Sequence, residues 1–176
     1  FSMQVWIKPE TTSSNCILNK DGAYLMILIN DKIRFIPVIG GGATLVTSSS
    51  TIPTDEWTHV GVTYDNTTLI LYINGVVEDT QAINGLVNTT TKNLWIGRQS
   101  SDEDNYFNGT IDSLALYNTT LSTAAMKESA DNKFVNNSGG KLGRLNRFVE
   151  YKVLLETNNT NSTPVVTDVV LSYMNY

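Results

Sequence analysis

Residues 57–75, WTHVGVTYDNTTLILYING, contain the pattern that decides the fold. Residues 57–64 and 69–73 are rich in β-branched, aromatic and other apolar residues and are bounded by turn residues, as is typical of β-strands. Asp65-Asn66 separates the two runs, and Asn74-Gly75 follows the second. Asn-Gly favours a type I′ turn, because both of its residues tolerate positive φ. The stretch therefore predicts consecutive antiparallel strands that turn tightly into a third.

Further strand and turn patterns lie on both sides of this stretch. Residues 24–29 and 32–38 are typical of a hairpin around the turn residues Asn30-Asp31. Other short strands are expected at residues 3–7, 76–77, 94–97 and 110–117. One short helix is expected at residues 123–130, with Ser122 as its N-cap. Short strands separated by turn residues indicate a β-sandwich or barrel rather than βαβ units.

The composition excludes several classes of protein. The 176 residues carry a net charge of −5 and a pI near 4.8, which argues against a nucleic-acid partner. A single cysteine excludes an internal disulfide framework and a cysteine-cluster zinc site. No apolar run reaches the roughly 18 residues that a membrane-spanning helix needs. With no leader-like stretch at its start, the sequence is typical of a mature product or an excised piece.

Uncharged polar residues dominate the surface chemistry. Charged residues make up 16% of the chain, against roughly 25% in an average domain. The sequence contains 22 Thr, 19 Asn and 14 Ser. Such a surface is wetted by hydroxyls and amides rather than by ion pairs.

The chain divides by pattern into three parts. Residues 1–130 form the strand-rich domain, and residues 131–146, which include the run NNSGG, are the best linker candidate. Residues 147–176 contain two strand patterns, 148–156 and 165–173, which predict an antiparallel pair. This pair is expected to pack on or complete the sandwich, or that of a neighbouring subunit.

Five motifs occur in order along the strand-rich part. They are FSMQVWIKP (1–9), WTHVGVTYD (57–65), LYING (71–75), LWIG (94–97) and YFNGTIDSLALYNTTL (106–121). Together they resemble a laminin G-like domain of the concanavalin A-like jelly-roll superfamily, over about residues 1–130. The resemblance implies an all-β fold: a two-sheet antiparallel jelly-roll sandwich with one short helix, here followed by a C-terminal hairpin tail.

Several motif residues have expected packing roles. Trp57 and Trp95 stand at strand starts and are expected to fill the core between the sheets. Gly109 is expected to allow a bulge or a close backbone approach at a strand entry. His59, the single histidine, is interpreted as a structural hydrogen-bonding residue. Cys16 is interpreted as a buried, unreactive thiol.

The sequence departs from the family pattern at both ends. Family domains usually have a strand before the segment that matches Phe1, and an unpaired edge at that place would invite another chain. The tail resembles β-rich tails of prokaryotic, including archaeal, surface proteins. Its last strand could fill the vacant place, within the same subunit or in a neighbour.

The sequence lacks the catalytic pattern of the glucanases in this superfamily. Those enzymes resemble one another in a Glu-x-Asp strand motif, which places two carboxylates across a sugar bond. None of the seven Glu residues is followed by Asp two positions later. The sequence therefore favours a protein that is not an enzyme.

The resemblance also implies a calcium site on the sandwich rim. The family's ligand positions match Asp21 and Asn108, the latter in place of a more usual Asp. Asp104, within the acidic run 102–104, could add a carboxylate. The alternative is that Asp21-Gly22 is a simple turn, Asn108 caps a bulge and residues 102–104 form a solvated loop.

Sequons are frequent and fall mostly in predicted turns or strand ends. Glycosylation is predicted at Asn66, Asn88, Asn118, Asn136, Asn158 and Asn161. Asn108 also heads a sequon but competes with the metal role. For ligand binding, the candidates for stacking on sugar rings are Tyr24, Tyr106 and Tyr117.

Two functional hypotheses follow, both at the cell surface or outside the cell. The first is a non-catalytic recognition or adhesion module that binds glycans or protein partners. The second is a structural subunit of a surface layer or filament, in which copies of the chain join by strand addition.

Overall fold

The computed structural model describes residues 1–99 and 105–131. The predicted linker beyond Asp131 and the predicted tail, residues 147–176, lie outside the described residues. The elements are β1 (Ser2–Pro9), β2 (Ser14–Lys20), β3 (Tyr24–Ile29), β4 (Lys32–Ile39), β5 (Gly42–Ala43), β6 (Val46–Thr47), β7 (Thr58–Tyr64), β8 (Thr68–Ile73), β9 (Val76–Ala82), β10 (Leu94–Ile96), β11 (Gly109–Tyr117) and α1 (Thr123–Asp131).

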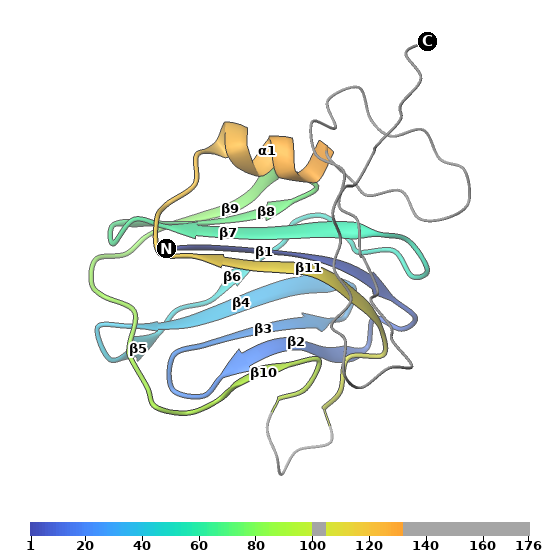
Figure 1. The fold of residues 1–176 in the computed structure, drawn as a ribbon, viewed down its shortest axis with the longest axis horizontal. Helices are drawn as coiled ribbons and strands as arrows, with labels where there is room; N and C mark the ends of the chain where they lie inside the picture. Colours follow the sequence, from blue (N-terminus) through green and yellow to red (C-terminus); the bar gives the residue numbers. More distant parts are fainter. Residues whose placement is uncertain (100–104, 132–176) are drawn as a thin grey trace, which may run out of the picture. The chain divides into compact units, whose positions relative to one another are not determined.

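The strands form two antiparallel sheets that face each other (Figure 1). The five-stranded sheet has the order β11-β1-β7-β8-β9. The second sheet has the order β10-β2-β3-β4-β5, with β6 also paired to β4. The β-sandwich predicted from the alternating patterns is therefore confirmed for the described residues.

Both predicted hairpin turns are present, and Asn74-Gly75 has the backbone conformation that its sequence predicted. Asn30 and Asp31 have φ of 49° and 61°, and Asn74 and Gly75 have φ of 50° and 75°. Positive φ at both central residues matches the right-handed twist of the flanking strands. After the second turn, β9 continues to Ala82 and is longer than the two residues that the pattern predicted.

The core consists of the inward-facing side chains of both sheets. Met3, Val5 and Ile7 of β1 are at most 1% exposed. The largest side chains of the core include Tyr64 of β7 and Phe35 of β4, both of which are fully buried.

The prediction that Trp57 and Trp95 fill the core is wrong. Trp57 lies just before β7 and is not part of the strand. Trp95 is the middle residue of β10. Its neighbour Leu94 packs against the core, so the Trp95 side chain lies on the opposite face. Both tryptophans are only partly buried. Because successive side chains of a strand alternate between faces, a shift of one residue moves a side chain out of the core.

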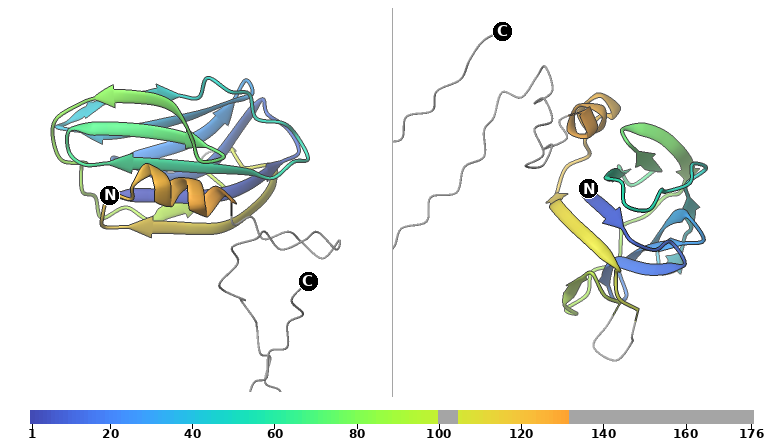
Figure 2. Two further views of the ribbon diagram at one scale, coloured as in Figure 1. Left: turned by 90° about the horizontal axis from the view of Figure 1, so that it is seen from above. Right: turned by 90° about the vertical axis from the view of Figure 1, so that its right-hand side faces the viewer.

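Helix α1 covers part of the outer face of the five-stranded sheet (Figures 1 and 2). Its N-cap is Ser122, as predicted, since the Ser122 Oγ accepts a hydrogen bond from the Ala125 N–H at 3.1 Å. Met126 and Ala130 are the buried residues of the helix. A Cβ on Gly61 of β7 would lie 2.8 Å from the Met126 Sδ, so the missing side chain makes room for the helix.

His59 is part of this covered face and is 1% exposed. Its Nε2 lies 3.2 Å from the Gln4 Oε1, and the Trp6 ring packs edge-on at 5.2 Å. The Gln4 Nε2 donates to the Tyr117 Oη at 2.9 Å, so the Gln4 Oε1 is the atom that faces His59. Because an amide oxygen only accepts hydrogen bonds, the His59 Nε2 carries the imidazole proton and donates it. The predicted structural role of His59 is confirmed. Cys16 is likewise buried, as expected.

The burial of His59 predicts a loss of stability in mild acid. Desolvation lowers the pKa of His59 from 6.5 to about 4, so the unfolded chain takes up this proton at a higher pH than the folded chain. As the pH falls through this window, the free energy of unfolding should decrease by about 3 kcal/mol, at ~1.4 kcal/mol per pH unit. Urea unfolding across the window measures the loss. The variant His59→Gln should lack this component, and a wild-type protein with constant stability would contradict the prediction.

Gly109 opens β11 at a point where two backbones nearly touch. A Cβ at this position would meet the Lys8 carbonyl oxygen and lie 2.7 Å from the Pro9 Cα. Its φ of +146° is also one that side-chain-bearing residues rarely adopt. The close backbone approach predicted at this strand entry is confirmed.

This geometry predicts that Gly109→Ala destabilises the domain by about 3 kcal/mol, through strain and steric overlap together. Gly41→Ala is the matched control, because Gly41 has a φ of +85° but nothing within 4 Å of the added Cβ. We expect a loss of about 1 kcal/mol there, from backbone strain alone. Thermal melting measures both, and equal losses would show that the close approach contributes nothing.

Candidate functional site

A cavity of about 260 Å³ opens at the end of the sandwich where β1 begins. We call it the end cavity. Its lining residues are Phe1, Ser2, Met3, Tyr24, Val87, Asn88, Thr89, Leu116 and Tyr117. They come from the start of β1, the start of β3, the end of β11 and the connection between β9 and β10. In Figure 1 this connection runs down the side of the sandwich that carries the N label.

Aromatic rings form one wall of the end cavity. Phe1 stacks on Tyr24 with ring centroids 6.4 Å apart and an angle of 20° between the planes. Tyr24 packs in turn on Phe35, and Phe1 meets Tyr64 edge-on at 6.1 Å. Burial raises the pKa of Tyr24 above its ordinary value, so its phenol stays neutral at physiological pH. The wall is thus rigid, uncharged and largely apolar.

Tyr64 anchors the connection that supplies the opposite wall. Its Oη donates towards the carbonyl oxygens of Ile83 and Gly85, at 3.0 and 2.7 Å. Burial, together with the negative charge of Asp65, raises the pKa of Tyr64 and keeps this donor protonated. The Tyr64 hydroxyl therefore fixes the first residues of the connection between β9 and β10.

Backbone pairing with the end of β4 holds the same connection at its cavity residues. The Gly40 N–H donates to the Leu86 carbonyl at 3.2 Å, and the Asn88 N–H donates to the Val38 carbonyl at 2.8 Å. Ile39 and Val87 form an isolated antiparallel bridge between these two bonds. Asn88 and Thr89 therefore line the cavity from a strand-like segment. The sequence shows no strand pattern at this segment.

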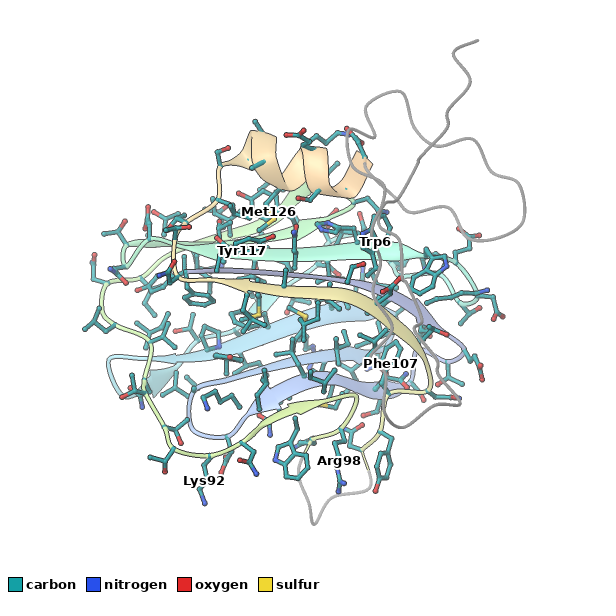
Figure 3. All side chains as sticks on the ribbon, viewed as in Figure 1. Trp6, Lys92, Arg98, Phe107, Tyr117 and Met126 are labelled. Carbon is teal, nitrogen blue, oxygen red and sulfur yellow. The ribbon has the colours of Figure 1, made fainter. Side chains whose placement is uncertain are left out.

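The β11 side of the cavity is held by β1. Ser2 is fully buried, and its Oγ donates to the Thr119 carbonyl at 2.9 Å and accepts from the Leu121 N–H at 2.8 Å. The Tyr117 Oη accepts from Gln4, which leaves the phenol proton for another partner. Figure 3 shows Tyr117 towards the left-hand end of the five-stranded sheet, where β11 ends.

The structure separates the three tyrosines that the sequence offered for ring stacking. Tyr24 and Tyr117 both line the end cavity. Tyr106, 51% exposed, lies near Arg98, whose guanidinium stands 4.9 Å from the Trp95 ring centroid and 5.2 Å from that of Tyr106 (Figure 3). Neither this stack nor the place of Phe1 and Leu116 in the cavity could be read from the motifs that contain them, because both depend on contacts between segments far apart in the sequence.

The structure places the two main calcium candidates at opposite ends of β2. Asp21 follows Lys20, the last residue of the strand, whereas the Asn108 N–H donates to the Asn15 Oδ1 near its start. A seven-residue strand is about 20 Å long, so Asp21 and Asn108 do not share a ligand. Asp104 lies outside the described residues. Within residues 1–99 and 105–131, no three His, Cys, Asp or Glu side chains cluster. Calcium binding stays a prediction.

Three predicted glycosylation residues lie in the described part of the chain. Asn66, Asn88 and Asn118 are exposed in turns or connections, where an acceptor is accessible. Asn88 also lines the end cavity, and Asn118 follows the lining residue Tyr117. The other three, Asn136, Asn158 and Asn161, lie outside the described residues.

The sheet order defines a two-sheet antiparallel β-sandwich. Residues 1–126 match the model of the concanavalin A-like lectin/glucanases superfamily, in its laminin G-like branch. The chain belongs to this family, as the five ordered motifs indicated. No curated protein sequence matches the chain significantly.

Solved structures of the same fold include binding domains. Domain 4 of a GH43 extracellular arabinanase from Geobacillus stearothermophilus, in complex with arabinotriose, is 26% identical, with a TM-score of 0.57 over 73% of this chain and 65% of that one. A candidate carbohydrate-binding protein from Bacteroides ovatus is 17% identical, with a TM-score of 0.61 over 72% of this chain. This chain spans only 39% of that protein.

A third similar structure is the heptameric SAP-like pentraxin from Limulus polyphemus. It is 15% identical, with a TM-score of 0.60 over 73% of this chain and 68% of that one.

Among the described residues, no helix is both long and apolar enough to cross a membrane.

Proposed function

We propose that this domain is a non-catalytic recognition module, acting outside the cell, that holds the end of a glycan chain in the end cavity. The observation that carries the proposal is the cavity itself: its lining combines stacked aromatic rings with uncharged polar residues on a segment that hydrogen bonds hold in place. Ligand sites combine an apolar lining with a few polar groups that set orientation. The volume of about 260 Å³ suits one sugar ring rather than a chain of them.

The related structures support a glycan ligand and an extracellular setting. The structure of the arabinanase domain that is 26% identical is a complex with arabinotriose, and its enzyme is described as extracellular. The exposed sequon residues Asn66, Asn88 and Asn118 suit a secreted or surface protein.

The chemistry of the cavity favours binding without catalysis. No carboxylate or imidazole is among its lining residues, so no group there is suited to protonate a glycosidic oxygen. His59 is buried elsewhere, on the face covered by α1, with a pKa of about 4. The Glu-x-Asp pattern of the superfamily's glucanases is also missing from the sequence.

Two exposed leucines allow a controlled test of the site. Leu116 lines the end cavity and is 46% exposed, whereas Leu86 is 72% exposed and is not a lining residue. We expect Leu116→Lys to weaken glycan binding at least about tenfold, because it places a charge in a largely apolar cavity. Leu86→Lys should bind as the wild type does.

The measurement is titration calorimetry with a glycan that a glycan array identifies for the wild type. Protein made in a host without N-glycosylation keeps Asn88 unmodified. A wild type that binds no glycan, or equal affinities for the two lysine variants, would contradict the proposal.

The open edge of β11 favours a second function, a structural subunit assembled by strand addition. β11 is nine residues long and pairs with β1; within the described residues it has no neighbour on its other side. Such an edge presents unpaired N–H and C=O groups to an extended segment of another chain. We propose that a neighbouring copy supplies this segment, for which the sequence offers residues 165–173.

Strand addition predicts assemblies that grow with protein concentration. Light scattering of the full chain at increasing concentration measures their mass. A synthetic peptide with the sequence of residues 165–173, added in excess, should compete for β11 and reduce that mass. A peptide of the same composition in scrambled order is the control, and a chain that stays monomeric at every concentration would contradict the second function.

A further inference from the structure

The end cavity carries no charged side chain. Most of its lining side chains are apolar and include Phe1, Met3, Val87 and Leu116. Burying a charged group against such side chains without a partner is costly. A uronic acid or a sulfated sugar therefore meets no cationic side chain there, and the ammonium of Phe1 already donates to the Tyr64 carbonyl at 2.7 Å.

The polar groups of the cavity are few and unequally available. The Ser2 Oγ already makes two hydrogen bonds, to the Thr119 carbonyl and from the Leu121 N–H. The Tyr117 Oη accepts from Gln4 on the outer face of the five-stranded sheet, so this phenol points away from the face that carries Met3 and Leu116. The side chains of Asn88 and Thr89 are exposed, so their amide and hydroxyl can meet a ligand.

The cavity therefore has two unlike parts. Asn88 and Thr89 offer neutral donors and acceptors to some hydroxyls of a sugar ring. The side chains of Phe1 and Leu116, on the remaining surface, offer no hydrogen bond. A hydroxyl that points there loses its bonds to water and gains none, whereas a methyl group there gains apolar contact.

We propose that the end cavity selects a neutral terminal sugar that carries a methyl group, as a 6-deoxy sugar or an N-acetylated sugar does. This inference rests on the proposed glycan-binding function and adds the class of sugar. The hydroxyls of the ring bind Asn88 and Thr89, and the methyl group packs on Phe1 and Leu116.

Pairs of sugars that differ only at the methyl-bearing position test the inference. L-fucose and L-galactose differ only in the hydroxyl at C6, as do L-rhamnose and L-mannose. N-acetylglucosamine and glucose differ only at C2. An apolar pocket discriminates against an added hydroxyl by ~100-fold at most. We therefore expect at least one methyl-bearing member to bind more tightly than its partner by a factor of at least about ten and at most about 100. Titration calorimetry with the methyl glycosides measures each ratio.

The outcomes separate the inference from the function on which it rests. If the hydroxylated members bind as tightly as the methyl-bearing ones in all three pairs, or more tightly, the selectivity is wrong and the glycan site remains. If no sugar of any pair binds, both proposals fail. If glucuronic acid binds more tightly than all of them, the neutral character of the site is wrong.

A matched pair of variants ties the selectivity to the cavity. Leu116→Asn should reduce the ratio of affinities for the methyl-bearing and hydroxylated sugars towards one, because the new amide can hydrogen-bond the added hydroxyl. Leu86→Asn, outside the lining, should keep the wild-type ratio. An unchanged ratio in Leu116→Asn would show that the methyl group lies elsewhere.

Discussion

β1 is the strand on which the rest of the structure depends, because it pairs with two strands that are far away in the sequence. Residues 2–7 align with 58–63 of β7 on one side, and residues 2–9 align with 109–117 of β11 on the other. A central strand satisfies its backbone groups on both sides while it buries alternate side chains. Met3, Val5 and Ile7 fill the core, and Gln4 on the opposite face bonds both His59 and Tyr117. The end cavity exists because this pairing brings the end of β11 beside Phe1.

The rigidity of the cavity comes from the same end of the sandwich. Tyr64 contributes its ring to the core and its hydroxyl to the connection that carries Asn88. The backbone of that connection pairs with the last residues of β4. A site held in this way loses little conformational freedom on binding, which favours affinity for a small ligand. The fold and the shape of the end cavity therefore depend on the same few contacts.

Local chemistry explains which features the sequence predicted well. The turns at Asn30-Asp31 and Asn74-Gly75, the Ser122 cap and the close approach at Gly109 each follow from one or two residues. The interpretation of Trp57 and Trp95 was wrong, because size and hydrophobicity say nothing about which face of a strand a side chain occupies.

The sequence by itself determined the all-β sandwich, its main turns, its helix and its family, since these depend on local periodicity and on ordered motifs. It also named Tyr24 and Tyr117 as ring-stacking candidates. Only the tertiary structure decided that these two share a cavity with Phe1, Asn88 and Leu116, and that Asp21 and Asn108 lie apart. The physical reason is strand order and register: alternation assigns a side chain to a face, but only long-range pairing decides which side chains become neighbours across that face.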